Sequence, residues 1–134
     1  MCGRGNYEAN LKGIMGYAQF EYANEELKDI LALADIVLSR AGANSIVELA
    51  ALAIPNILVP LTLSQSRGDQ VLNAQSFVRQ GFSVMLDEEK LTDQSLLNTI
   101  ESVYNNRKKY IDNMKRKVNI ASEEIIINLI DTNS

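Results

Sequence analysis

The 134-residue chain has the length of a single domain, and its 46% apolar content excludes an intrinsically disordered protein. A net charge of −4 argues against a broad nucleic-acid-binding surface. One cysteine (Cys2) and no histidine exclude an internal disulfide, a Ser-His-Asp triad and histidine-based metal sites within the chain, and favour a reducing compartment.

The first third of the chain is weakly patterned. Residues 1–16 are poorly patterned, and Gly3–Asn6 is typical of a loop. Tyr17–Tyr22 places aromatic residues as in a short strand followed by its exit loop. Asn24 is a suitable N-cap for a helix, whose apolar face comprises Leu27, Ile30, Leu31 and Ala34.

The stretch Ile36–Glu48 is the most informative part of the sequence. A β-branched apolar run at Ile36–Leu38 is followed by small residues and then by a helix-forming run at Ser45–Ala53. This pattern predicts a buried strand, a tight turn at Gly42 and a helix. Glycine lets a ligand approach the backbone, and a helix N-terminus offers unpaired N–H donors, so an anion such as a diphosphate suits this position.

Glu48 has two interpretations that spacing alone leaves open. Ser45 and Glu48 match the capping box, in which the two side chains satisfy the first backbone donors of a helix. Alternatively, a carboxylate one turn into the helix accepts hydrogen bonds from the two hydroxyls of a ribose.

Strands and helices alternate through the rest of the chain. The expected elements are, in order, a strand at Asn56–Pro60, a polar loop at Thr62–Asp69, a helix at Gln70–Gln80 ended by Gly81, a strand at Ser83–Leu86, a turn at Asp87–Lys90, a helix capped by Thr92, and a helix over 107–130. The last helix has a basic face (Arg107, Lys108, Lys109, Lys115, Arg116, Lys117), which suits either solvent or an acidic partner or membrane surface.

This alternation predicts an α/β domain with a Rossmann-like parallel sheet and flanking helices. Ligands of such sheets bind beyond the carboxyl ends of the strands. We therefore expect Phe20–Tyr22, Ala41–Glu48 and Ser64–Asn73 to converge on one crevice.

Several ordered strings of the sequence resemble the MurG family of glycosyltransferases. They are S-R-A-G-A-N-S-I-V-E-L (Ser39–Leu49), P-N-I-L-V-P-L (Pro55–Leu61) and S-R-G-D-Q-V-L-N-A (Ser66–Ala74), with G-Y-A-Q-F-E-Y before them and Q-G-F after them. Members of this family are inverting hexosyltransferases that move N-acetylglucosamine from UDP-N-acetylglucosamine to lipid I. The product is lipid II, a precursor of peptidoglycan.

The resemblance implies a GT-B fold of two Rossmann-like domains, of which this chain is a truncated C-terminal, UDP-sugar-binding part. The N-terminal domain, with the site for lipid I and the catalytic base, lies outside the match. The resemblance therefore implies no catalytic residue in this chain and no activity for the chain alone. It also implies a cytoplasmic location at the inner face of the cell membrane for the whole enzyme.

The resemblance assigns roles to individual residues. It implies that Phe20 and Tyr22 meet the uracil, that Glu48 accepts the ribose hydroxyls, and that no metal or other cofactor is needed. The diphosphate is expected at Gly42, Ala43, Asn44 and Ser45, and the donor sugar at Asp69 and Gln70 with Asn73 close by.

A non-enzymatic α/β module that binds a nucleotide or transmits a signal is the alternative to a glycosyltransferase. In the Rossmann strand order that the resemblance implies, the first two strands of the domain, expected to be missing here, would lie beside Ile36–Ser39. We therefore expect an open sheet edge at Ile36–Ser39 that is prone to pairing with another chain. The same order predicts that residues 1–22 are displaced or loosely held.

Overall fold

The structure is a computed structural model that describes residues 1, 4–21, 25–62, 65 and 67–117. The chain divides into two compact units, Met1–Leu33 and Ala34–Ser134. Across the described residues, each helix is too short or too polar to cross a lipid bilayer. Asn24, the expected helix cap, and the continuation of the last helix to Ile130 lie outside these residues.

The first unit contains the short 3-10 helix η1 (Ala9–Leu11) and the helix α1 (Glu26–Leu33). The strand expected at Tyr17–Phe20 is absent, so that prediction was wrong. A strand requires a neighbouring backbone, and here the amide side chain of Gln19 takes that place. Its Oε1 accepts from the Glu8 N–H (3.1 Å) and its Nε2 donates to the Glu8 carbonyl (2.7 Å).

The second unit is built on a parallel sheet of three strands in the order β1-β2-β3. These strands are β1 (Val37–Ser39), β2 (Asn56–Leu58) and β3 (Ser83–Met85). β2 and β3 lie inside the apolar runs from which they were predicted, and β1 overlaps the run Ile36–Leu38. The prediction that β1 is buried was wrong, because it lies at an edge of the sheet and Leu38 is 50% exposed. Among the described strands, β1 pairs only with β2 and forms one edge of the sheet, as the strand order predicted.

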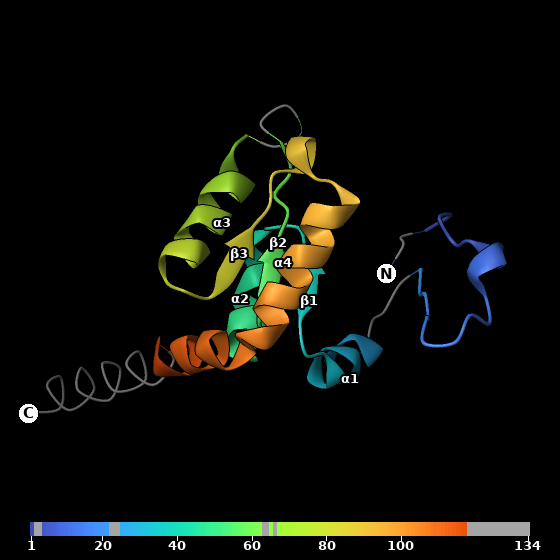
Figure 1. Cartoon of the computed structure of the whole chain (residues 1–134), viewed down its shortest axis with the longest axis horizontal. Coiled ribbons are helices and arrows are strands. Elements are labelled where there is room, and N and C mark those ends of the chain that lie inside the picture. Colours follow the sequence, from blue (N-terminus) through green and yellow to red (C-terminus); the bar gives the residue numbers. More distant parts are fainter. Residues whose placement is uncertain (2–3, 22–24, 63–64, 66, 118–134) are drawn as a thin grey trace, which may run out of the picture. The chain divides into compact units, whose positions relative to one another are not determined.

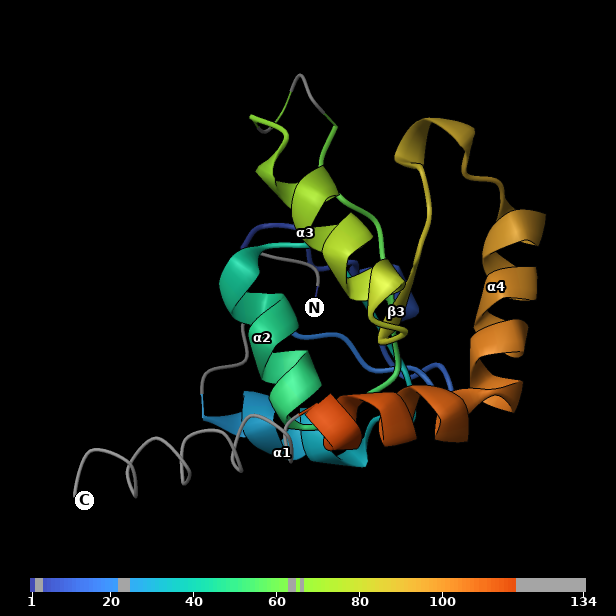
Figure 2. The ribbon, with the colours of Figure 1, turned by 90° about the vertical axis from the view of Figure 1, so that its left-hand side faces the viewer.

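Helices cover both faces of this sheet (Figures 1 and 2). The helices α2 (Ala43–Ala51) and α3 (Asp69–Arg79) lie on one face, as consecutive right-handed crossovers require. The helix α4 (Asp93–Asn105) lies on the other face, and a further helix over 107–117 crosses the amino end of the strands. The α/β fold that the sequence predicted is therefore confirmed.

The core lies between the sheet and its helices. Alternate side chains of a strand point to opposite faces, so Leu58 faces α2 and α3 while Ile57 faces α4. Leu58 packs in a cluster whose other members are Ala41, Ile46, Ala74, Phe77 and Met85. Ile57 is fully buried, as is Val103 of α4.

One polar pair interrupts this apolar core. Asn56 and Ser83 stand opposite each other in β2 and β3, and both are at most 3% exposed. The Ser83 hydroxyl lies 2.5 Å from Oδ1 of Asn56, whose Nδ2 donates to the Ile54 carbonyl. The pair is satisfied internally, which avoids the cost of an unpaired buried polar group.

The ends of α4 and β3 are also set by specific contacts. Thr92 caps α4 in a capping box with Ser95, as the sequence predicted for Thr92. Gly81 precedes β3 with φ +77°, a left-handed conformation that favours glycine. Its carbonyl accepts a hydrogen bond of 3.0 Å from the side chain of Asn113, which attaches the last helix to the sheet.

Candidate nucleotide-binding site

The helix α2 begins at the carboxyl end of β1, with Gly42 as its N-cap residue. Its first internal hydrogen bond runs from the Ile46 N–H to the Gly42 carbonyl. Ala43, Asn44 and Ser45 form the exposed first turn, and no side chain caps it. Their backbone N–H groups therefore point outward without a partner among the described residues.

Gly42 does not make the tight turn that the sequence predicted. Its φ is −64° and its ψ is 141°, which any residue adopts easily. A Cβ atom built on Gly42 meets nothing within 4 Å. The missing side chain thus leaves open space directly beside the free N–H groups of α2.

The structure separates the two interpretations of Glu48. The helix starts two residues before Ser45, so Ser45 is not the cap and the capping box is absent. Glu48 is half-buried in the second turn of α2, and its carboxylate makes no hydrogen bond or ion pair with the described residues. It is therefore available to accept hydrogen bonds from a ligand.

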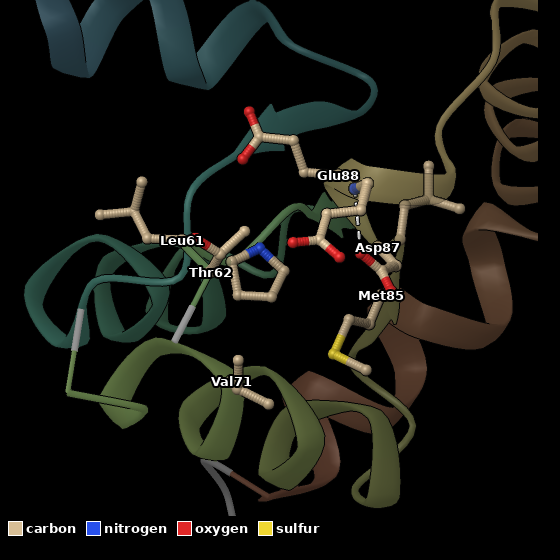
Figure 3. A pocket seen from close by; sticks show the side chains of 9 residues that line it. Leu61, Thr62, Val71, Met85, Asp87 and Glu88 are labelled. Atoms are coloured by element: carbon tan, nitrogen blue, oxygen red, sulfur yellow. Dashed lines mark hydrogen bonds between the residues drawn. The ribbon is translucent and has the colours of Figure 1, made fainter. Parts of the chain in front are cut away.

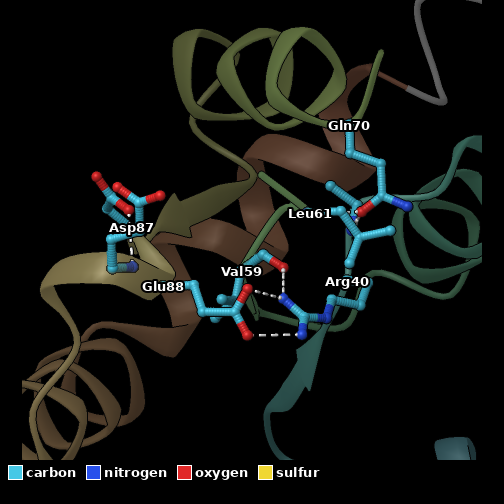
Figure 4. A network of polar contacts seen from close by, with 8 residues as sticks. Arg40, Val59, Leu61, Gln70, Asp87 and Glu88 are labelled. Atoms are coloured by element: carbon cyan, nitrogen blue, oxygen red, sulfur yellow. Dashed lines mark hydrogen bonds and ion pairs between the residues drawn. The ribbon is translucent and has the colours of Figure 1, made fainter. Parts of the chain in front are cut away.

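Two amide side chains of α3 hold the loop before α2. Gln70 Oε1 accepts from the Ala41 N–H (3.3 Å) and from the Leu61 N–H (3.0 Å). Asn73 Nδ2 donates to the Ala41 carbonyl (3.1 Å). Figure 4 shows the Gln70 amide directed at Leu61, at the carboxyl edge of the sheet. The structure therefore brings the stretches Ala41–Glu48 and Asp69–Asn73 together.

These contacts define which atoms of the two amides remain for a ligand. Backbone N–H groups can bind only an acceptor, so the Gln70 oxygen must face Ala41 and Leu61. Its Nε2 then remains a free hydrogen-bond donor among the described residues. By the same reasoning, the Asn73 nitrogen faces the Ala41 carbonyl and uses one of its two N–H donors there, while its Oδ1 remains an acceptor.

Arg40 joins the ends of all three strands, a role that the sequence analysis missed. Its guanidinium donates to the Val59 carbonyl (3.2 Å) after β2 and forms two hydrogen bonds, of 3.0 and 2.8 Å, with Glu88 after β3 (Figure 4). These hydrogen bonds lower the pKa of the Glu88 carboxyl below its ordinary value and raise the pKa of Arg40. A charged residue directly after an apolar strand was the available sequence signal.

A pocket of about 460 Å³ opens beside this network (Figure 3). The pocket is lined by the last residue of β3, by residues that follow β2 and β3, and by the first turn of α3, namely Pro60, Leu61, Thr62, Val71, Met85, Leu86, Asp87, Glu88 and Glu89. The lining is largely apolar but includes three acidic side chains. Leu61 and Val71 adjoin the Gln70 contacts, so the pocket continues from the α3 end of the candidate site.

The other site residues that the sequence predicted do not all lie at this edge of the sheet. Asp69 is exposed in the first turn of α3, next to Gln70. Phe20 is exposed and belongs to the first unit. Tyr22 lies outside the described residues. The proposed contact of Phe20 and Tyr22 with a uracil stays a prediction.

With this geometry established, comparison with known sequences gives the family. The sequence model of the glycosyltransferase family 28 C-terminal domain matches residues 1–130, nearly the whole chain. The chain belongs to this family. The family 28 match agrees with the parallel sheet and with the open helix N-terminus at its carboxyl edge.

Curated relatives refine the placement within family 28. The chain is 52% identical, over 98% of its length, to the UDP-N-acetylglucosamine--N-acetylmuramyl-(pentapeptide) pyrophosphoryl-undecaprenol N-acetylglucosamine transferase of Clostridium tetani, and 53% identical over 86% to the enzyme of the same name from Clostridium perfringens. It covers 36% and 32% of these proteins. The resemblance to the MurG family is thereby confirmed, for about a third of the length of such enzymes.

A solved structure supports the fold of this family 28 domain. The glycotransferase of kitacinnamycin superposes on 74% of the chain, with a TM-score of 0.57 and 19% identity. The chain matches 26% of that protein. The likeness concerns the fold and confirms a Rossmann-like domain of the GT-B type.

Proposed function

We propose that this chain binds UDP-N-acetylglucosamine, the donor for the transfer that converts lipid I to lipid II. The main support is the meeting of two loops at the carboxyl edge of the sheet, where Gln70 and Asn73 bind both polar groups of Ala41. This arrangement places the free N–H donors of α2 beside the start of α3. The names of the relatives favour this function over a non-enzymatic signalling module.

The diphosphate, the ribose and the sugar of the donor each have a matching group in this domain. The diphosphate lies over the first turn of α2, where unpaired N–H groups offer hydrogen bonds and the helix dipole adds about 0.3–1 kcal/mol of stabilisation for an anion. Glu48, one turn further along α2, accepts hydrogen bonds from the ribose hydroxyls. A hydrogen bond to a charged group is worth about 1.5–3 kcal/mol. The sugar lies toward Asp69 and the free Nε2 of Gln70, at the entrance of the 460 Å³ pocket.

On the same proposal, this domain alone is not sufficient for catalysis. The acceptor lipid I and the catalytic base belong to the part of the relatives that this chain does not match. Donor binding here needs no metal, since the phosphate charge meets backbone N–H groups. The whole enzyme works on the cytoplasmic face of the membrane, where its lipid acceptor is embedded.

Titration of the ¹⁵N-labelled 134-residue chain with UDP-N-acetylglucosamine, followed by NMR, tests the proposal. We expect a Kd of roughly 1 mM, equivalent to about −4 kcal/mol. The amide signals of residues 43–48 and the side-chain amide of Gln70 should shift with one common Kd. The matched control is CMP, which should bind at least tenfold more weakly. Absence of shifts at 10 mM donor, or equal binding of CMP, would refute the proposal.

A further inference from the structure

Ala41 has an unusual position in the candidate site. It is fully buried, one residue before the N-cap of α2, and lies in neither a strand nor a helix. Its backbone N–H and carbonyl therefore have no regular secondary-structure partner, although buried peptide groups need hydrogen bonds. Both are satisfied by side chains of a single helix, α3.

Gln70 and Asn73 are three residues apart, so they stand on the same face of α3. Gln70 accepts from the Ala41 N–H, and Asn73 donates to the Ala41 carbonyl. The N–H and the carbonyl of Ala41 are therefore both held by side chains of α3. We call this pair of amides the Ala41 clamp. Gln70 also accepts from the Leu61 N–H, so the clamp includes the loop after β2.

The clamp holds the residue that directly precedes the N-cap of α2. Gly42 follows Ala41 directly and caps a helix whose first turn has no side-chain cap. The direction of the free N–H groups at Ala43–Ser45 therefore depends on the conformation at Ala41. Hydrogen bonds to a phosphate weaken steeply when donors move by a fraction of an ångström or rotate.

We infer that Asn73 is a positioning residue for the diphosphate. Through the Ala41 carbonyl, it holds the first turn of α2 in the orientation that binds phosphate oxygens, without touching them itself. This inference rests on the proposed donor site and goes beyond it, because it makes affinity for UDP, which carries no sugar, depend on a side chain of α3. A role limited to contact with the donor sugar would leave UDP affinity unchanged.

The chain offers a closely matched control. Asn113 Nδ2 donates to the Gly81 carbonyl at 3.0 Å, and this bond is half-buried like the 3.1 Å bond of Asn73. It attaches the last helix beside β3, at the opposite end of the sheet. Asn113→Ala therefore removes the same kind of bond away from the candidate site.

The experiment compares Asn73→Asp, Asn73→Ala and Asn113→Ala with the wild-type 134-residue chain. UDP affinity is measured by NMR titration, and the ¹³C shift of the Ala41 carbonyl and the hydrogen exchange of the Ala41 amide report the loop directly. We expect both Asn73 variants to raise the Kd for UDP about five- to tenfold, with a changed Ala41 carbonyl shift and at least tenfold faster exchange at Ala41. Asn113→Ala should change the Kd less than twofold, even where it lowers the melting temperature.

The outcomes separate this inference from the proposed function. A wild-type chain that does not bind UDP refutes the proposed function and, with it, the positioning role. A wild-type chain that binds UDP, together with Asn73 variants of unchanged affinity, overturns the positioning role alone. An equal loss of affinity in Asn113→Ala also overturns it, because general destabilisation then explains the effect.

Discussion

Replacing Gly42 by alanine should separate ligand binding from stability. The backbone at Gly42 has φ −64°, and an added Cβ meets no atom within 4 Å. Alanine therefore fits the unliganded protein without strain. The added methyl group does, however, fill the space beside the free N–H groups of α2, where we place the diphosphate.

The expected change in stability is small because two effects oppose each other. Alanine restricts the unfolded chain and stabilises by about 0.4–1 kcal/mol. Alanine is also a poorer N-cap residue than glycine, which costs a similar amount, roughly 0.5–1 kcal/mol. The free energy of unfolding should therefore change by less than about 0.5 kcal/mol, and the Tm by less than roughly 3 °C.

In the same variant, the affinity for UDP should fall clearly although the stability hardly changes. A methyl group that keeps a phosphate from even one N–H donor removes about 1.5–3 kcal/mol of charge-assisted hydrogen bonding, which corresponds to a Kd for UDP at least tenfold higher. Calorimetry or NMR titration of UDP measures this change, and thermal unfolding followed by circular dichroism measures stability.

Gly81→Ala is the matched control for this experiment. Gly81 has φ +77°, and a Cβ there would lie 2.6 Å from Nδ2 of Asn113. This variant should lose about 1–2 kcal/mol of stability yet bind UDP with unchanged affinity while folded. Unchanged UDP affinity in Gly42→Ala would refute the placement of the diphosphate at the start of α2.

Three further predictions concern other parts of the domain. Glu48→Gln should weaken uridine binding about tenfold but 2′-deoxyuridine binding less, as measured by NMR titration, because a neutral amide accepts ribose hydroxyls poorly. The lowered pKa of Glu88 means that its ion pair with Arg40 stabilises the fold above the ordinary glutamate pKa, and that this contribution is lost as pH falls through the lowered value. In Arg40→Met, the acid unfolding transition should lack the loss of stability that comes from this ion pair. An acid transition unchanged from that of the wild type would contradict this expectation. Leu38→Lys should abolish any concentration-dependent self-association seen by analytical ultracentrifugation, because Leu38 is half exposed on the edge strand β1.

The parts of the fold with strong local patterns could be predicted from the sequence. Short apolar runs bounded by proline or glycine, such as Asn56–Pro60, contain a strand in the structure. The boundary between Thr92 and α4 was correct because a capping residue acts within its own turn. Such features depend on neighbours in the chain, which a sequence displays directly.

Features that depend on distant partners could not be predicted. The stretch Tyr17–Phe20 pairs with no strand among the described residues, and the Gln19 side chain instead pairs with the backbone of Glu8. The hydrogen bonds of the Ala41 clamp join residues 29 and 32 positions apart. Sequence comparison suggested amides near a sugar, but only three-dimensional geometry shows which of their atoms the backbone already occupies.

The buried pair of Asn56 and Ser83 has a consequence for how this domain tolerates mutation. The two side chains satisfy each other only when these residues stand opposite. A shift of the strand register by one position would therefore leave both side chains unpaired in an apolar interior. That shift would move the loop after β3 by about 3.3 Å relative to the loop after β2. A substitution at only one of these two positions should therefore destabilise the domain, whereas a matched pair of substitutions should be tolerated. This buried pair thus fixes the register of β2 against β3, and with it the relative position of the loops that follow the two strands.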